Sequence, residues 1–237
     1  MSGYLIPNAL PCKTIRALDA AAIQECRIPG LLLMENAGEG CVRQIEMLAT
    51  EDPSRIVPPF KIVSGFGNNA GDGFVIARHL ANRGYAVNIH LTAARSRIRL
   101  SSDAGINFEI AVAMGIPIFE PDGEVKTEIS RATSGGGTIV DAIFGSGLSR
   151  PVTSPQREWI EHINASGLPV LAIDIPSGLD ADSGEALGAA VRAAHTFTFV
   201  APKLGFERAA GPQCAGRVHV VGISIPRQLL ESALTNE

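Results

Sequence analysis

The 237-residue chain lacks several features that define whole classes of protein. Its four cysteines show no C-x-x-C or other metal-ligand spacing, which argues against a cysteine-based zinc site. No dense basic cluster is present and the net charge is −4, so the footprint of a nucleic-acid-binding protein is missing. No apolar run reaches the length of a membrane span, and no stretch resembles a secretory leader. We therefore expect a cytoplasmic protein with reduced thiols, no membrane contact and no nucleic-acid partner.

The composition is that of a folded globular domain. Apolar residues make up 46% of the chain and charged residues 19%, which excludes a disordered protein. The length suits one sizeable α/β domain. No repeat, low-complexity segment or linker divides the chain, so we expect a single domain over residues 1–237. Within it, we expect N-terminal helices over 14–50 and an α/β core over 60–225.

The spacing of apolar residues predicts two helices and then alternating strands and helices. Thr14 is the expected cap of the first helix, Pro29-Gly30 ends it, and the second runs to about Leu48. Further helices are expected near 73–83, 103–114 and 155–165. Short runs that are apolar on both faces predict buried parallel strands near 61–64, 87–91, 116–119, 138–143, 169–173, 196–200 and 218–222. The expected fold is a three-layer α/β/α, Rossmann-like domain with a mostly parallel central sheet.

The first strand of this core is followed by a glycine-rich segment, which at 63–73 reads VSGFGNNAGDG. Such a segment before a helix lets backbone N–H groups approach an anion. It is not a Walker A loop, because no Lys-Ser/Thr pair follows. It matches G-x-G-x-x-A, but the next strand runs into Thr92-Ala93-Ala94-Arg95 without the acidic residue of a dehydrogenase fingerprint. A tight packing turn is the alternative, yet two amides and a carboxylate exceed what a turn needs. The segment therefore predicts a phosphate cradle that also offers oxygen ligands.

Two later strands each end in a carboxylate. Asp141 precedes AIFGSGLSRP, and Asp174 precedes IPSGLDADSG, which contains Ser177. Lys203 follows another strand and would either reach a phosphate or cap a turn. Each feature alone is compatible with an acidic strand end and a flexible loop. Because parallel strands end at one edge of the sheet, where ligands of such folds bind, we expect these loops to form one site.

In combination, these motifs resemble the YjeF N-terminal family, whose enzymatic members are NAD(P)H-hydrate epimerases. The resemblance covers nearly the whole chain in family order, through residues 33–38, the glycine-rich segment, 141–148, 174–184 and 203–205. Phe66 stands where the family often has Pro, which we expect to alter the wall of the segment and not the chemistry. The resemblance implies interconversion of the R and S forms of hydrated NADH or NADPH (NADHX, NADPHX) at C6 of the nicotinamide ring. A separate dehydratase would then repair the cofactor.

The resemblance also implies site residues. It implies one potassium ion, with Asn69, Asp141 and Ser177 as ligands; oxygen donors suit such a hard cation better than zinc. The implied substrate contacts are Asn68, Asn69, Ala70, Gly71, Asp72, Gly145, Ser146, Gly147, Leu148, Ser149, Arg150, Pro151 and Asp174. Loss and re-addition of hydroxide needs a proton-exchanging group, for which a carboxylate with a pKa raised by burial is suitable. Asp174 is the first candidate for this acid/base and Asp72 the second.

A non-catalytic nucleotide-binding or scaffold module of the same fold is the alternative function, since the family also contains such modules. The presence of Asn69, Asp141 and Asp174 favours an enzyme. The sequence leaves open whether NADHX or NADPHX is preferred. It also leaves open whether the chain forms a homodimer, for which the N-terminal helices are a possible interface.

Overall fold

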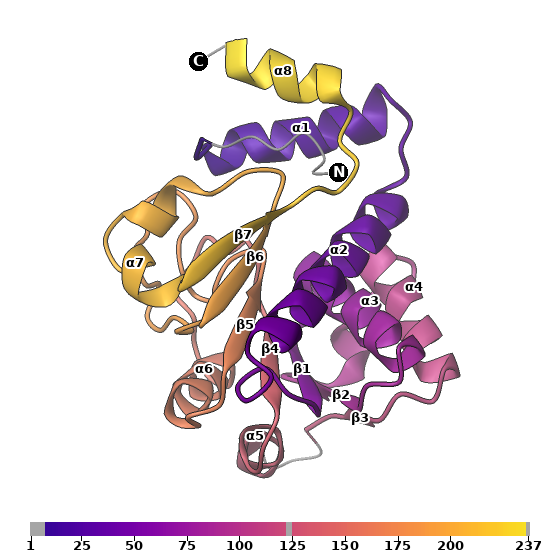
Figure 1. The fold of residues 1–237 in the computed structure, drawn as a ribbon, viewed down its shortest axis with the longest axis vertical. Coiled ribbons are helices and arrows are strands. Elements are labelled where there is room, and N and C mark those ends of the chain that lie inside the picture. The colour runs from indigo at the N-terminus through magenta and orange to yellow at the C-terminus, as the bar shows by residue number, and fades with distance from the viewer. Residues whose placement is uncertain (1–7, 122–124, 236–237) are drawn as a thin grey trace.

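A computed structural model gives the fold and describes residues 8–121 and 125–235. Within these residues, seven strands form one sheet in the order β3-β2-β1-β4-β5-β6-β7 (Figure 1). The strands are β1 (Phe60–Ser64), β2 (Val87–Leu91), β3 (Ile118–Phe119), β4 (Thr138–Ala142), β5 (Val170–Ile173), β6 (His195–Phe199) and β7 (Arg217–Val221). Every neighbouring pair is parallel. The predicted Rossmann-like class is confirmed, and each predicted strand begins and ends within two residues of the observed one.

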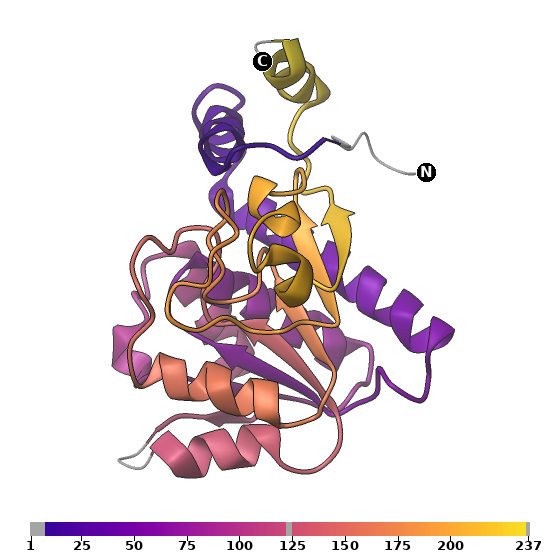
Figure 2. The same ribbon diagram turned by 90° about the vertical axis from the view of Figure 1, so that its left-hand side faces the viewer.

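Helices cover both faces of the sheet (Figures 1 and 2). One face carries α2 (Gly30–Glu51), α3 (Asn68–Asn82) and α4 (Asp103–Ala113), and the other carries α5 (Val125–Thr133) and α6 (Gln156–Ala165). Ile62 of β1 belongs to the apolar cluster on the face that carries α2, α3 and α4. The adjacent Val63 belongs to the cluster on the opposite face, which includes Trp159 of α6. Both faces of the strands are therefore buried, which explains why their sequences are apolar without alternation. In the described part of the chain, no helix is both long and apolar enough to cross a membrane.

A helical pair lies beyond the carboxyl ends of the strands. Helix α1 (Cys12–Gln24) packs against α8 (Arg227–Thr235) (Figure 1). The apolar pattern did not predict helix α8. The predicted cap Thr14 is wrong, because α1 begins two residues earlier. Pro11 precedes it with φ −59° and supplies no side-chain cap. Leu10 is anchored beside Lys203, and this contact holds α1 next to the strand ends. Three short helices complete the description, η1 (Arg95–Arg97), η2 (Leu204–Glu207) and α7 (Gly211–Cys214).

Helix α3 begins at Asn68, five residues before its predicted start, so much of the glycine-rich segment is helical. The glycines have packing roles there. A Cβ added at Gly71 would lie 2.6 Å from Met34 Sδ of α2, and one added at Gly73 would lie 2.7 Å from Ala142 Cβ of β4. The pattern that predicts a loop thus reflects the close approach of α3 to α2 and to the sheet.

Candidate functional site

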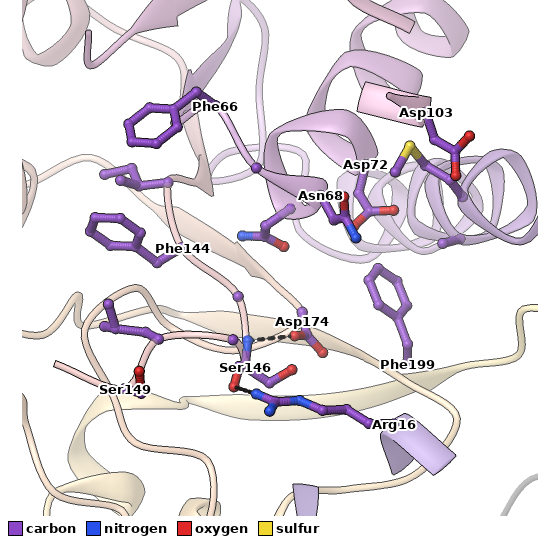
Figure 3. Close-up of a pocket in the computed structure, with 18 of the residues that line it drawn as sticks. Arg16, Phe66, Asn68, Asp72, Asp103, Phe144, Ser146, Ser149, Asp174 and Phe199 are labelled. Carbon is purple, nitrogen blue, oxygen red and sulfur yellow. Dashed lines mark hydrogen bonds between the residues drawn. The ribbon is translucent and has the colours of Figure 1, made fainter. Parts of the chain in front are cut away.

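The candidate site lies at the point where the strand order reverses. Strand β1 stands between β2 and β4, so the connections from β1 and β4 leave toward opposite sides and open a crevice beyond the strand ends. A cavity of about 900 Å³ occupies this crevice, near the upper end of the range for ligand pockets (Figure 3). The start of α3, the segment after β4 and residues of α1 and α2 line it.

The cavity brings together most of the substrate contacts implied by the resemblance. Its lining includes Asn68, Asn69, Asp72, Asp174 and every residue of 145–151. Ala70 and Gly71 are outside the lining, because they are buried within the first turn of α3 and face the core. Figure 3 shows Asn68 and Asp72 on the α3 side, with Asp174 and Ser146 across from them.

Asp174 sits at the end of β5 in a strained turn. Its φ of 66° is left-handed, and Ile175 N–H donates to the Ile173 carbonyl across it at 2.8 Å, which defines a γ-turn. Such a backbone costs on the order of 1–3 kcal/mol and is typical of functional sites. The turn directs the carboxylate at Ser146, whose N–H donates to it at 2.8 Å, and at Lys203, whose Nζ lies 2.7 Å from Oδ1.

The sequence left open whether Lys203 contacts a phosphate or caps a turn, and the structure adds an ion pair that the sequence did not predict. The Lys203 side chain is only 1% exposed, and its ammonium group donates to Thr198 Oγ1 at 2.7 Å and to the Phe199 carbonyl at 3.2 Å as well as pairing with Asp174. Lys203 is therefore the buried counter-ion of Asp174.

The carboxyl groups of the cavity have pKa values that are pushed in opposite directions. Burial acts to raise the pKa of Asp174, but the Lys203 ammonium and the hydrogen bonds from Lys203 and Ser146 outweigh it and lower that pKa. Burial raises the pKa of Asp72 well above its ordinary value, and the charges of Asp174 and Asp19 add to this against the opposing effect of Lys203. The expectation of a raised pKa at Asp174 is thus wrong. Burial therefore favours the neutral form of Asp72, whereas the Lys203 ammonium favours the ionised form of Asp174.

Helix α1 contributes cavity residues that sequence reasoning missed. Arg16 donates from Nη2 to the Ser146 carbonyl at 2.6 Å, and Asp19 also lines the cavity (Figure 3). The pKa of Asp19 is raised by burial and by the charge of Asp174. Arg16 and Ser146 are 130 residues apart, and both α1 side chains read as the polar face of an ordinary amphipathic helix. No local signal identifies them.

A set of oxygen donors lies where the resemblance implies a cation. Asp141 is fully buried at the end of β4; its Oδ1 accepts from Ser177 Oγ at 2.6 Å and its Oδ2 from Ser177 N–H at 2.8 Å. Asn69 lies against the segment after β4, since a Cβ built on Gly145 would be 3.3 Å from Asn69 Cβ. Both polar atoms of the Asn69 amide are buried without a hydrogen-bond partner in the described part of the chain. A buried amide without a partner offers an oxygen of the type that a hard cation prefers, as do the carboxylate of Asp141 and the hydroxyl of Ser177.

Comparisons with known proteins agree on one family. Residues 30–205 match the family model described as YjeF-related protein N-terminus. The NAD(P)H-hydrate epimerase of Rhodopirellula baltica is 40% identical over 221 residues, which cover 93% of this chain and 86% of the relative. The enzyme of the same name from Pirellula staleyi is 41% identical over 221 residues, covering 91% and 92% of the two chains.

Two further matches concern architecture. The bifunctional NAD(P)H-hydrate repair enzyme Nnr of Thermofilum pendens is 41% identical over 222 residues, which cover 92% of this chain and 40% of that longer protein. The crystal structure of yeast ynu0, YNL200c, superposes with a TM-score of 0.76 at 22% identity and covers 95% of this chain and 93% of its own. At that identity the likeness supports the fold alone.

Proposed function

The chain belongs to the family of YjeF-related protein N-termini, and on that premise we propose that it is an NAD(P)H-hydrate epimerase. Its substrates would be NADHX and NADPHX, and its reaction the interconversion of their R and S forms at C6 of the nicotinamide ring. The observation that carries the proposal is the carboxyl pair of the cavity, because Asp72 and Asp174 have pKa values moved apart by their surroundings. Pairs of that kind assign the acid and the base of a proton-transfer site.

The proposed reaction conserves atoms and charge through a cationic intermediate. The lone pair of the ring nitrogen N1 forms a C=N bond to C6 while the C6–O bond breaks and the oxygen takes a proton, so that water leaves. Water then adds to C6 from the opposite face and loses a proton, and the C=N electrons return to N1. No oxidant or reductant is consumed. The step needs one proton donor and one proton acceptor beside C6.

Asp72 and Asp174 supply these two functions in our proposal. Asp72 is protonated before the reaction and gives its proton to the departing hydroxyl group. Asp174 is ionised, which stabilises the iminium cation and accepts the proton of the incoming water. Its ion pair with Lys203 and its hydrogen bond from Ser146 keep it charged and oriented. Asp174, the first candidate for a combined acid and base, thus keeps only the role of the base in our proposal, and Asp72, the second candidate, takes the role of the acid. Proton exchange with solvent through the open cavity then restores the starting protonation states of Asp72 and Asp174.

The dinucleotide would be bound along the same crevice. We propose that the start of α3 and residues 145–151 hold the pyrophosphate. Gly67, the residue before α3, supplies no side-chain cap, so the first N–H groups of the helix are available to an anion. Arg150 adds positive charge at the rim. Ala70 and Gly71 would act indirectly, by fixing the position of this first turn through their packing.

A potassium ion is part of the proposal, with Asn69, Asp141 and Ser177 as its ligands. The orphan amide of Asn69 and the hydrogen-bonded pair of Asp141 and Ser177 support it. When bound, the ion would supply fixed positive charge at the ends of β4 and β5. Asp141 and Ser177 already join the ends of β4 and β5 by hydrogen bonds, and in our proposal the ion would link Asn69, at the start of α3, to them.

A dehydratase that consumes one epimer is the proposed functional partner. The name of the Thermofilum pendens relative, a bifunctional hydrate repair enzyme, supports a link between the two activities. We also propose a cytoplasmic location, which the four free cysteines support because oxidising compartments favour disulfides. The homodimer implied by the resemblance is a further proposal, which sedimentation of the purified protein tests.

The test of the proposed function is conversion of one purified epimer of NADHX or NADPHX into the other, followed by chromatography against a blank without protein. An epimerase accelerates the approach to the equilibrium mixture from either side. A non-catalytic binding module would bind the hydrated cofactor and leave the rate of the blank unchanged, and that result would select the alternative.

A further inference from the structure

The cavity extends well beyond its carboxyl pair. It continues past the start of α3 to the segment that follows β2, where Ala93 and Arg97 line it. Strand β2 lies on the opposite side of β1 from β4 and β5. In doubly wound sheets a dinucleotide spans the switch point, with one half on each side. With the nicotinamide ring at Asp72 and Asp174, the adenosine half is therefore placed over the end of β2.

The segment after β2 is the position at which dinucleotide-binding folds distinguish the two cofactors. A carboxylate there binds the ribose hydroxyls of a non-phosphorylated cofactor, whereas an arginine nearby accommodates a 2′-phosphate. This chain has Thr92-Ala93-Ala94 at that point and no carboxylate. Asp103 does line the cavity, but a Cβ built on Gly30 would be 2.6 Å from its Oδ2, which places it against the start of α2. Figure 3 shows it on the side of the cavity opposite Phe66.

Three arginines follow β2, and they differ in the contacts that their side chains make. Arg95 is held by Glu120, with its Nε 2.5 Å from Oε1 and its backbone N–H also bound to that carboxylate. Arg99 donates to Ser101 Oγ and does not line the cavity. Arg97 has no carboxylate within ion-pair distance in the described part of the chain.

The Arg97 guanidinium lies over the ring of Phe66, 4.5 Å from its centroid. This cation–π contact places the guanidinium at the cavity wall, and its side chain has no hydrogen bond or ion pair in the described part of the chain. A guanidinium without a competing acceptor is well suited to a phosphate group.

We propose that Arg97, oriented by Phe66, binds the 2′-phosphate of the adenosine ribose, so that NADPHX is the preferred substrate of this site. The inference rests on the proposed function for the identity of the substrate. The subsite itself, an arginine specific for an adenosine 2′-phosphate, can be tested without turnover.

The first experiment measures binding of two probes of equal charge, adenosine 2′,5′-bisphosphate and adenosine 3′,5′-bisphosphate, by calorimetry. We expect the 2′,5′ isomer to bind about 10- to 100-fold more tightly, as for a charge-assisted contact to one phosphate. Arg97→Gln removes that difference, and the matched control Arg99→Gln keeps it. Equal affinity of the two isomers for the wild-type protein overturns the proposal, and so does an equal loss of both on Arg97→Gln, which would assign Arg97 to the 5′-phosphate or pyrophosphate.

The second experiment measures kcat/KM for NADPHX and NADHX in the same three proteins. Arg97→Gln should lower the value for NADPHX about 10- to 100-fold and leave that for NADHX within about twofold. An unchanged ratio of the two values overturns the inference. If the wild-type protein turns over neither substrate but still selects the 2′,5′ probe through Arg97, the epimerase proposal fails and the 2′-phosphate subsite stands.

Discussion

Replacing Lys203 by methionine tests the electrostatics of the site most severely. Methionine preserves most of the length of the side chain and removes only the charge and its hydrogen bonds. The ammonium group that is lost lies 2.7 Å from Asp174 Oδ1; the Lys203 side chain is 1% exposed and the Asp174 side chain 13%. The variant therefore leaves a buried carboxylate without its counter-ion.

The magnitude follows from this burial. Removing one partner of a buried ion pair costs about 3–5 kcal/mol, chiefly because the remaining charge is uncompensated. Asp174 keeps its hydrogen bond from the Ser146 N–H, and the cavity gives it some access to water. We therefore expect Lys203→Met to lower the free energy of unfolding at pH 7.5 by about 3 kcal/mol, the lower end of that range.

The pH dependence has a defined sign. In the wild-type protein the pKa of Asp174 is lowered by Lys203. The stability that this group contributes is present above its unfolded pKa and is lost as the pH falls through the folded pKa. Without the ammonium, burial holds the pKa of Asp174 above its ordinary value, so the variant becomes less stable as the pH rises above about 4. The acid limb of the kcat/KM profile should move to higher pH, because the ionised form of Asp174 is the active one.

Denaturant unfolding from pH 4 to pH 8 measures both effects. The double variant Lys203→Met/Asp174→Asn is the control, since a neutral amide in place of the carboxylate should restore stability and remove the pH dependence. A loss below about 1 kcal/mol, or a loss independent of pH, would refute the claim that Lys203 sets the ionisation of Asp174.

Three other predictions follow from the same site. Asp72→Asn should lower turnover about 100- to 10,000-fold with little change in affinity for the hydrated cofactor, and near-normal turnover by this variant would exclude Asp72 as the acid. In the wild-type protein, kcat/KM should fall as the pH rises through the raised pKa of Asp72. Potassium chloride should stabilise the protein more than lithium chloride of equal concentration, by up to about 2.7 kcal/mol when potassium is at 100 times its Kd, and the melting temperature should rise accordingly. Asn69→Leu should abolish this difference between the two salts; an unchanged difference would contradict the ligand set. Gly71→Ala should lower the free energy of unfolding by about 1–3 kcal/mol, because the added Cβ would meet Met34. Gly67→Ala, whose Cβ would meet nothing within 4 Å, should change thermal unfolding little; equal effects of the two variants would contradict the packing role of Gly71.

The parts of the fold that could be predicted from sequence are those fixed by local pattern and by general rules of sheets. Apolar runs gave strands within two residues of the observed ones, and the rule that parallel strands end at one edge correctly placed Asp141 and Asp174 at the ends of the neighbouring strands β4 and β5. The start of α3 was missed because Gly71 and Gly73 look like loop residues in isolation. Their meaning depends on Met34 and the sheet, which are remote contacts.

The charge state of the site is likewise non-local. The γ-turn at Asp174, the burial of Lys203 and the approach of Arg16 to Ser146 all depend on segments far apart in the chain. For this reason the sequence led to the wrong direction for the pKa of Asp174. The pairing of a loop lysine with a strand-end aspartate has no periodicity that would reveal it. Only the packed structure shows which carboxyl group has the counter-ion.

The measurement that tests the central claim most directly is epimer conversion in water enriched in oxygen-18. A single purified epimer of NADPHX is incubated with the wild-type protein, with Asp72→Asn, and with no protein. The products are separated by chromatography, and the mass of each epimer is measured by mass spectrometry. Our account predicts that the wild-type protein forms the other epimer much faster than the blank, that each converted molecule carries the heavy oxygen at C6, and that Asp72→Asn approaches the blank. Conversion at the rate of the blank, or fast conversion that retains the original oxygen, would contradict it.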